Sequence, residues 1–133
     1  MLRQALSMDA VFVSEFVDGH RIFRHVDIAS GAPQIFPGQS DPLEASWCQL
    51  VVDGRLPQLI PDASELPNRD ELPSIPFDIG THLSTPVILS DGRVYGTLCC
   101  FSCSPNPYIR QNDLTNLQGV AKVLAAHIQI PIR

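Results

Sequence analysis

The chain has 133 residues, which is enough for one domain with a hydrophobic core of its own. Apolar residues make up 44% of it and charged residues 17%, a composition that excludes an intrinsically disordered protein. The formal net charge is -5 and the nine lysine and arginine residues form no cluster, so we expect neither nucleic acid nor an anionic membrane among the partners.

The chain is predicted to begin with a short helix and a β-hairpin. Residues 1–6 (MLRQAL) place apolar side chains on one side of a helix that is too short to pack alone. We therefore expect the natural helix to begin upstream, and the domain to be excised from a longer protein. Residues 10–17 and 20–28 are rich in β-branched and aromatic residues and flank Asp18-Gly19, a strong hairpin signal.

The middle of the chain predicts a helix, a short strand and an irregular loop. In SDPLEASWCQLVVDG, Asp41 is placed to cap a helix and Gly54 to end it. A short strand is expected at 58–60, and the irregular run 63–80 is long enough that we expect it to have a function. The helix should bury the apolar side chains that recur at helical spacing: Leu43, Trp47, Leu50 and Val51.

The last part of the chain predicts a second hairpin and a long helix. Residues 81–89 and 93–102 flank Asp91-Gly92, and an amphipathic helix begins near Asp113. Its apolar side chains repeat at heptad spacing: Leu114, Leu117, Ala121, Leu124 and Ile128. The order helix, hairpin, helix, loop, hairpin, helix predicts an antiparallel sheet with helices, which is an α+β architecture.

The stretch LSDGRVYGTLCCFSC holds three of the four cysteines. Strand alternation puts Cys99 and Cys103 on one face and Cys100 on the other, so the pair Cys100 and Cys103 cannot bind one zinc ion. A structural zinc site commonly needs a second ligand pair, which the sequence lacks, so we expect no metal. Because we find no secretion signal and no apolar run of ~18 residues, we expect a cytoplasmic protein with reduced, buried thiols.

Gly96 lies inside the predicted strand 93–102. A glycine in a strand marks a bulge or the close approach of another group. We expect that group to be a packed helix, with a ligand as the alternative.

With both hairpins placed, the chain resembles a GAF domain, a sensory module related in fold to PAS domains. The most specific segment is THLSTPVILSDGRVYGTLCCFS, where a strand with Pro86 leads through a glycine turn into a strand that carries Gly96-Thr97-Leu98. The resemblance covers nearly all of residues 1–133 except the truncated first helix. The run LEASWCQLVVDGRLPQLIPDA is most similar to GAF domains attached to bacterial cyclic di-GMP enzymes (GGDEF and EAL domains) or histidine kinases.

The resemblance implies both an architecture and a role. The sheet would have five to six antiparallel strands, with the terminal helices on one face and a lobe of helix and loops, residues 41–82, on the other. A small molecule bound under this lobe would change the packing of the terminal helices, which would pass the signal to an output domain in the same chain. The domain itself would be non-catalytic, and the terminal helices would form a homodimer.

Six residues are candidates for the wall of this pocket: Trp47, Cys48, Asp62, His82, Tyr95 and Thr97. His82 lies at the mouth of a strand, although such a histidine is more often a half-exposed strand end. Asp62 follows a proline where a strand meets a loop, a position that also suits turn chemistry. Tyr95 and Thr97 share a sheet face, which is either the pocket wall or the side packed by helices.

Family members with a covalent bilin attach it to a lobe cysteine that is usually followed by histidine. Cys48 is followed by Gln49, and the next cysteine is Cys99, so we expect no bilin and no other cofactor. The signature of cyclic-nucleotide GAF domains is absent, as are the motifs of the common catalytic sites. We therefore assign no catalytic residue.

Two alternatives to a sensory domain stay open. The first is a thiol-based reductase or peroxidase that uses Cys48 with Cys99 or Cys103. The resemblance argues against it, because relatives that reduce free methionine sulfoxide use cysteines of the lobe loops and this chain has none between Cys48 and Cys99. The second is a ligand-free module whose pocket is filled and which serves only for dimerisation.

Overall fold

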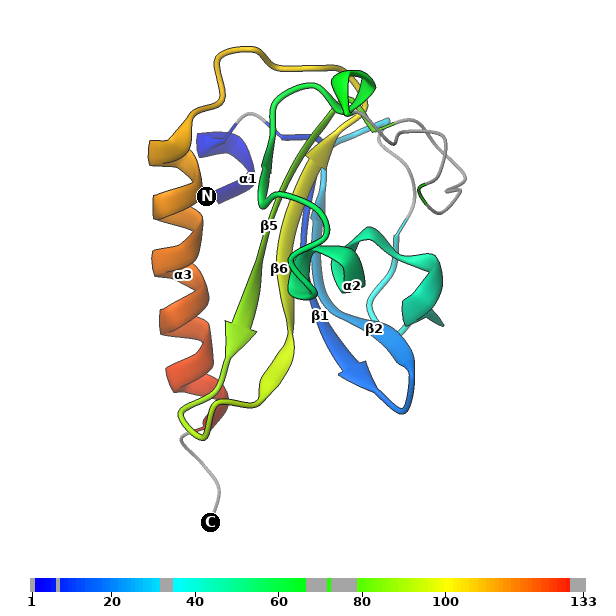
Figure 1. Ribbon diagram of the computed structural model, residues 1–133, viewed down its shortest axis with the longest axis vertical. Helices are drawn as coiled ribbons and strands as arrows, with labels where there is room; N and C mark the ends of the chain where they lie inside the picture. Colours follow the sequence, from blue (N-terminus) through cyan, green and yellow to red (C-terminus); the bar gives the residue numbers. More distant parts are fainter. Residues whose placement is uncertain (1, 7, 32–34, 67–71, 73–78, 130–133) are drawn as a thin grey trace.

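The computed structural model describes residues 2–6, 8–31, 35–66, 72 and 79–129. Figure 1 shows a central antiparallel sheet with the long helix α3 along one face and α2 on the other, which confirms the α+β architecture. The strands are arranged in the order β3-β2-β1-β6-β5-β4. The helices and strands are α1 (Leu2–Ala5), β1 (Ala10–Val17), β2 (His20–Ile28), β3 (Ser40–Pro42), α2 (Trp47–Val52), β4 (Leu59–Ile60), β5 (Thr81–Ile88), β6 (Val94–Ser102) and α3 (Gln111–Gln129).

Both predicted hairpins are present. Asp18 and Gly19 join β1 to β2 with φ angles of 49° and 78°. Two consecutive positive φ angles are typical of the type I′ turn, whose twist matches that of the flanking strands. Gly92, with a φ of 88°, lies between β5 and β6. The two hairpins join at the centre of the sheet, where β1 pairs with β6.

The predicted helix that starts at Asp41 is wrong in its first turn. Asp41 lies in the short strand β3, directly opposite Arg21 of β2. A 3-10 turn follows, and α2 begins only at Trp47, with Ser46 as its N-cap residue. The side chain of Ser46 accepts a hydrogen bond from the backbone N–H of Gln49. Asp41 thus has no capping role and pairs with an arginine instead.

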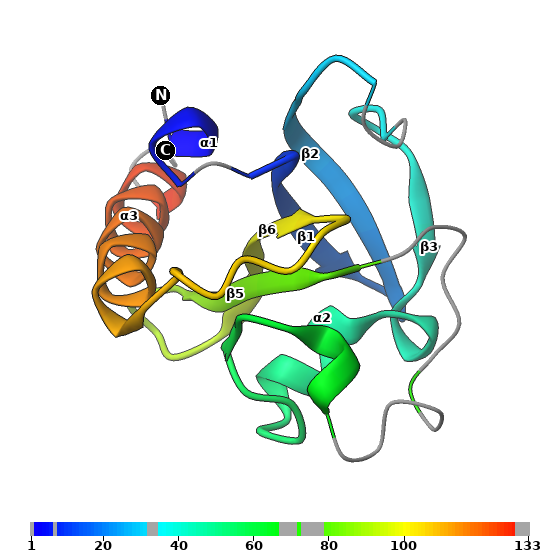
Figure 2. The same ribbon diagram turned by 90° about the horizontal axis from the view of Figure 1, so that it is seen from above.

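The sheet separates two hydrophobic clusters. The cluster beneath α1 and α3 contains, among others, Val13, Leu83, Leu98, Cys100, Leu117 and Ala121. The cluster beneath α2 contains, among others, Phe12, Phe23, Trp47, Cys48, Cys99 and Phe101. Figure 2 shows the two layers on opposite sides of the sheet, with α1 beside α3. Neighbouring residues of β6 point to opposite faces, so Cys99 and Cys100 belong to different clusters, as predicted.

Strand β6 differs from expectation at two neighbouring residues, Tyr95 and Gly96. Val87 pairs with Gly96 but Ile88 pairs with Val94, so Tyr95 is an extra residue without a partner position on β5. Tyr95 consequently packs against the cluster beneath α3 and does not share a face with Thr97. A Cβ atom on Gly96 would lie 1.9 Å from the backbone oxygen of Ser14, so the close neighbour is strand β1, neither a helix nor a ligand.

The long helix α3 confirms the predicted apolar stripe. Leu114, Leu117 and Ala121 are buried against the sheet, and Leu124 and Ile128 pack partly buried at its margin. None of the helices in the described part of the chain has the length and apolar character needed to cross a lipid bilayer.

Candidate functional site

The face of the sheet beneath α2 carries a buried cluster of polar side chains at its centre. Ser14, His82, Ser84 and Thr97 come from the three adjacent strands β1, β6 and β5, and each is at most 2% exposed. Because β5 and β6 pair with Ser84 opposite Cys99, these side chains point to the α2 side of the sheet. We call this set, together with Trp47 and Cys48 of α2 and with Cys99 and Arg21, the lobe-face cluster.

Cys48 is the point at which α2 contacts this cluster. Thr97 donates a hydrogen bond from Oγ1 to Cys48 Sγ over 3.1 Å. The Thr97 hydroxyl is also 2.9 Å from the hydroxyl of Ser14, so the three side chains form a chain across β1, β6 and α2. Arg21 donates a second hydrogen bond to Cys48 Sγ, from Nη1 over 3.3 Å.

Arg21 reaches the cluster from β2, where an ion pair and two aromatic rings fix its guanidinium group. Its Nε and Nη2 donate to the two carboxylate oxygens of Asp41 over 2.9 and 2.6 Å, a bidentate pair. The guanidinium carbon lies 4.6 Å from the ring centroid of Phe23 and 5.5 Å from that of Phe12. Burial alone would lower the pKa of Arg21, but Cys48 and Asp41 more than offset this and raise it.

These contacts make the two thiols of the cluster chemically different. The hydrogen bond from Cys99 is the largest cause that lowers the pKa of Cys48; Arg21 and Thr97 lower it further and outweigh the opposing effect of burial. Burial first, and then the neighbouring Cys48, raise the pKa of Cys99 well above its ordinary value. The arrangement therefore favours a thiolate at Cys48 and a neutral thiol at Cys99.

His82 is buried and neutral. Its ring centroid lies 5.3 Å from that of Trp47, edge to face, and its Nε2 is 3.4 Å from Cys99 Sγ. Burial, and secondarily the positive charge of Arg21, lower the pKa of His82 to about 3. Its exposed fraction of 2% shows that the expectation of a half-exposed strand end is wrong.

Two buried polar atoms on β5 have no hydrogen-bond partner among the described residues: His82 Nδ1 and Ser84 Oγ. The two residues alternate along one strand and therefore lie on the same side of the sheet. A buried polar atom without a partner costs about 1–3 kcal/mol, so native proteins rarely keep one without a reason. These two atoms are the members of the cluster whose hydrogen-bonding capacity is unused among the described residues.

We expect Ser84→Ala to raise the free energy of unfolding of the ligand-free chain by roughly 1 kcal/mol, because it removes a buried hydroxyl that has no partner among the described residues. The matched variant is Ser14→Ala on the same face, where the hydroxyl is paired with Thr97 and its loss should cost about 1 kcal/mol. Urea denaturation of both variants measures whether the free energy of unfolding rises in Ser84→Ala and falls in Ser14→Ala. Equal destabilisation by both would show that Ser84 is satisfied in the same way as Ser14.

The structure brings four of the six predicted site residues together: Trp47, Cys48, His82 and Thr97. It does not bring Asp62 to them, because the Asp62 carboxylate accepts hydrogen bonds from the backbone and side chain of Ser64 at the start of a 3-10 turn. Tyr95 lies on the other side of the sheet, near Glu15 and Arg24. That the four residues bind a ligand stays a prediction.

Sequence reasoning missed Ser14, Arg21 and Ser84. A usable signal existed for Arg21, which alternates with the buried Phe23 in β2 and so points to the same face. The two serines carry no such signal, because their environment depends on which strands are neighbours in the sheet.

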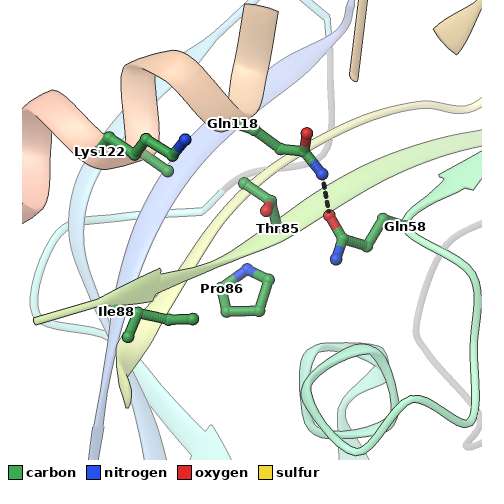
Figure 3. A pocket seen from close by; sticks show the side chains of 7 residues that line it. Gln58, Thr85, Pro86, Ile88, Gln118 and Lys122 are labelled. Atoms are coloured by element: carbon green, nitrogen blue, oxygen red, sulfur yellow. Dashed lines mark hydrogen bonds between the residues drawn. The ribbon is translucent and has the colours of Figure 1, made fainter. Parts of the chain in front are cut away.

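A separate groove of about 380 Å³ lies between α3 and β5. Figure 3 shows Gln58 and Gln118 facing each other across it, with a hydrogen bond of 3.0 Å between their side-chain amides. The other lining residues that it labels are Thr85, Pro86, Ile88 and Lys122. None of the lobe-face cluster lines this groove. In the described ranges, no group of three histidine, cysteine or acidic side chains is placed to hold a metal ion.

One protein family matches this chain when its sequence is compared with family models. The model of the family described as "GAF domain" matches residues 1–129. The diguanylate cyclase DgcP of Escherichia coli (strain K12) is 26% identical over 131 residues, which cover 97% of this chain and 37% of that protein. The chain thus spans little more than a third of this curated relative.

Solved structures agree in fold at low sequence identity. The GAF domain of PixJ from Thermosynechococcus elongatus, in its blue-light absorbing form, superposes with a TM-score of 0.74 at 19% identity, over 96% of this chain and 78% of that one. The chromophore-binding domain of the bacteriophytochrome RpBphP3 from R. palustris superposes with a TM-score of 0.74 at 18% identity, over 97% of this chain and 51% of that one. The GAF domain of an Acinetobacter phosphoenolpyruvate-protein phosphotransferase superposes with a TM-score of 0.72 at 17% identity, over 99% of this chain and 81% of that one.

Proposed function

The chain belongs to the GAF domain family, and from this premise we propose that it is a non-catalytic sensory domain that binds a small molecule between the sheet and the α2 lobe. The observation that carries the proposal is the pair of buried polar atoms without partners among the described residues, His82 Nδ1 and Ser84 Oγ. They lie beneath the lobe that the family resemblance assigns to ligand binding. A bound molecule that hydrogen-bonds both would remove their desolvation cost.

The charges of the lobe-face cluster narrow the chemistry of the ligand. Asp41 already pairs with the positive charge of Arg21, and the thiolate form of Cys48 adds a negative charge, so the cluster offers no unpaired cation to an anionic ligand. His82 is neutral and its Nε2 contacts Cys99 Sγ, so its Nδ1 offers a ligand either a donor or an acceptor, according to the tautomer. The cluster therefore favours an uncharged molecule with a donor and an acceptor, and the ring of Trp47 beside His82 suits an apolar or aromatic portion.

Binding would be communicated through strands β5 and β6. Adjacent residues of β5 point to opposite faces, so His82 contacts the lobe side while Leu83 packs beneath α3. In β6 the same holds for Cys99 and Cys100. A displacement of these strands by a ligand would therefore change how α1 and α3 pack on the sheet. The ligand can shift the equilibrium between the two packing arrangements only as far as its affinity differs between them.

We also propose that the domain regulates an output domain in the same chain, because its curated relative is a diguanylate cyclase nearly three times as long as the matched region. An output domain that makes cyclic di-GMP in a bacterial cytoplasm fits that relationship. The proposed homodimer would use the terminal helices, and Val120 and Val123 are exposed apolar residues on α3 that suit such a contact.

Trp47 provides a direct test, because it is the only tryptophan of the chain and lies in the lobe-face cluster. The chain is unfolded in guanidinium chloride, freed of small molecules by gel filtration, and refolded. We expect the low-molecular-mass fraction released from the same preparation to change the emission of Trp47 in a saturable way. An unchanged emission at all concentrations, with the fraction still raising the melting temperature, would place the binding site elsewhere.

A further inference from the structure

The two thiols of the lobe-face cluster come from segments far apart in the sequence. Cys48 lies in α2 and Cys99 in β6, and both are free thiols that are at most 1% exposed. Both belong to the hydrophobic cluster beneath α2, and Thr97, whose hydroxyl donates to Cys48 Sγ over 3.1 Å, lies two residues before Cys99 on the same face of β6. The effect of each thiol on the pKa of the other agrees with this close placement. Cys100 points to the opposite face, where its thiol is 3.6 Å from the Leu83 carbonyl oxygen. Cys103 lies beyond the end of β6.

The surroundings of Cys48 are those of an activated nucleophile. Two donors converge on its sulfur, the Arg21 guanidinium and the Thr97 hydroxyl. A thiolate, and not a thiol, attacks an electrophile, and a neighbouring arginine is one of the features that stabilise it. Asp41 fixes the guanidinium through two hydrogen bonds, so the positive charge stays beside the sulfur.

Cys99 has the complementary character. It is buried on β6, where its sulfur is 3.4 Å from His82 Nε2, and it keeps its proton because burial and the adjacent Cys48 disfavour a second thiolate. A protonated thiol beside a reactive one can act second, after its neighbour has been oxidised. One site thus contains a reactive thiol and a candidate resolving thiol.

We propose that Cys48 and Cys99 form a redox pair, in which a small hydroperoxide oxidises Cys48 and Cys99 then closes a disulfide between α2 and β6. In the first step the Cys48 sulfur attacks one oxygen of the peroxide. The O–O bond breaks, Cys48 becomes a sulfenic acid, and the leaving oxygen takes a proton to give water or an alcohol. In the second step the Cys99 sulfur attacks Cys48 Sγ, and the hydroxyl leaves with the Cys99 proton as water.

The two thiols therefore give up two electrons in forming the disulfide, and these electrons reduce one peroxide O–O bond. A cellular dithiol would return the pair to its reduced form. The inference goes beyond the proposed ligand site, since the chemistry needs no other bound molecule. Because both sulfurs are buried, the oxidant must be small, such as hydrogen peroxide. A disulfide would fasten the lobe to the sheet and remove the thiolate that accepts a hydrogen bond from Arg21, so oxidation would act at the same place as the proposed ligand.

The first test maps the oxidised bond. The reduced chain is treated with an equimolar amount of hydrogen peroxide, alkylated in denaturant and digested, and the peptides are analysed by mass spectrometry. We expect a Cys48–Cys99 link in wild type and in Cys100→Ser, the matched variant at the adjacent position. In Cys99→Ser we expect no link, and a sulfenic acid at Cys48 that reacts with dimedone. A folded wild-type chain that is oxidised first at Cys103, or that forms no Cys48–Cys99 link, overturns the proposal.

The second test addresses the role of Arg21. Stopped-flow mixing with hydrogen peroxide gives the rate of Cys48 oxidation, which should fall about tenfold or more in Arg21→Gln and much less in Arg21→Lys, which keeps the charge. Circular dichroism checks that both variants are folded. Equal rates in wild type and in a folded Arg21→Gln variant would contradict the activation of Cys48. Cumene hydroperoxide, a bulky oxidant, should react far more slowly than hydrogen peroxide, and comparable rates would contradict the buried site.

Discussion

Acidification from about pH 6.5 to about pH 4 is expected to reduce the free energy of unfolding by about 3 kcal/mol through His82 alone. Burial keeps the imidazole neutral in the folded chain, with its pKa lowered from 6.5 to about 3. The unfolded chain binds a proton below about pH 6.5 and the folded chain does not. The stability that His82 contributes is therefore complete above pH 6.5 and is lost progressively as the pH falls towards 3.

Urea denaturation at a series of pH values measures this effect. The His82→Gln variant should lose the part of the pH dependence that belongs to His82, whatever its own stability at neutral pH. His25→Gln is the matched control, since His25 is exposed on β2. If wild type and His82→Gln show parallel curves between pH 6.5 and 4, then His82 is protonated in the folded chain and is not the buried neutral imidazole of the structure.

Gly96→Ala is expected to reduce the free energy of unfolding by about 3 kcal/mol or more. The new methyl group would lie 1.9 Å from the Ser14 carbonyl oxygen and 2.8 Å from its carbon, so the backbones of β1 and β6 would have to separate. These are the two central strands, and the Ser14–Thr97 hydrogen bond lies between them. The substitution should therefore disturb the lobe-face cluster as well as the fold.

Gly119→Ala is the matched control for this substitution. Gly119 lies in α3, where a Cβ atom would meet no described atom within 4 Å, so alanine there should stabilise the helix by about 0.5–1 kcal/mol. Thermal unfolding by circular dichroism compares the two variants with wild type. A Gly96→Ala chain that melts at the wild-type temperature would show that β1 and β6 do not approach each other so closely at this position.

The sequence predicts those parts of the fold that depend on neighbouring residues along the chain. The hairpin at Asp18-Gly19 is confirmed because positive φ angles are a local property of these two residues. The predicted start of α2 is wrong because Asp41 has a distant partner, Arg21, whose pairing outweighs a capping role. The predicted face of Tyr95 is wrong because alternation assumes a regular strand, and a bulge breaks it.

The candidate site depends even more than the fold on contacts between residues that are distant in the sequence. Trp47, Cys48, His82 and Thr97 can be predicted because their segments belong to the lobe and the last hairpin. The hydroxyl of Ser84, which has no partner among the described residues, cannot be predicted, since its state depends on the positions of all neighbouring donors and acceptors. The approach of Cys48 to Cys99 likewise requires the packing of α2 on β6, which the sequence leaves as an open alternative.

Native mass spectrometry of the chain as purified tests the central claim, that a small molecule binds at His82 and Ser84, most directly. Wild type and Thr85→Val should carry an additional mass that is absent under denaturing conditions, because Thr85 lines the groove on the other side of the sheet. Ser84→Ala, which removes one of the two unpartnered atoms, should lose most of that mass. A wild-type chain without any bound mass, or a bound mass that Ser84→Ala retains and Thr85→Val loses, would contradict binding at this site.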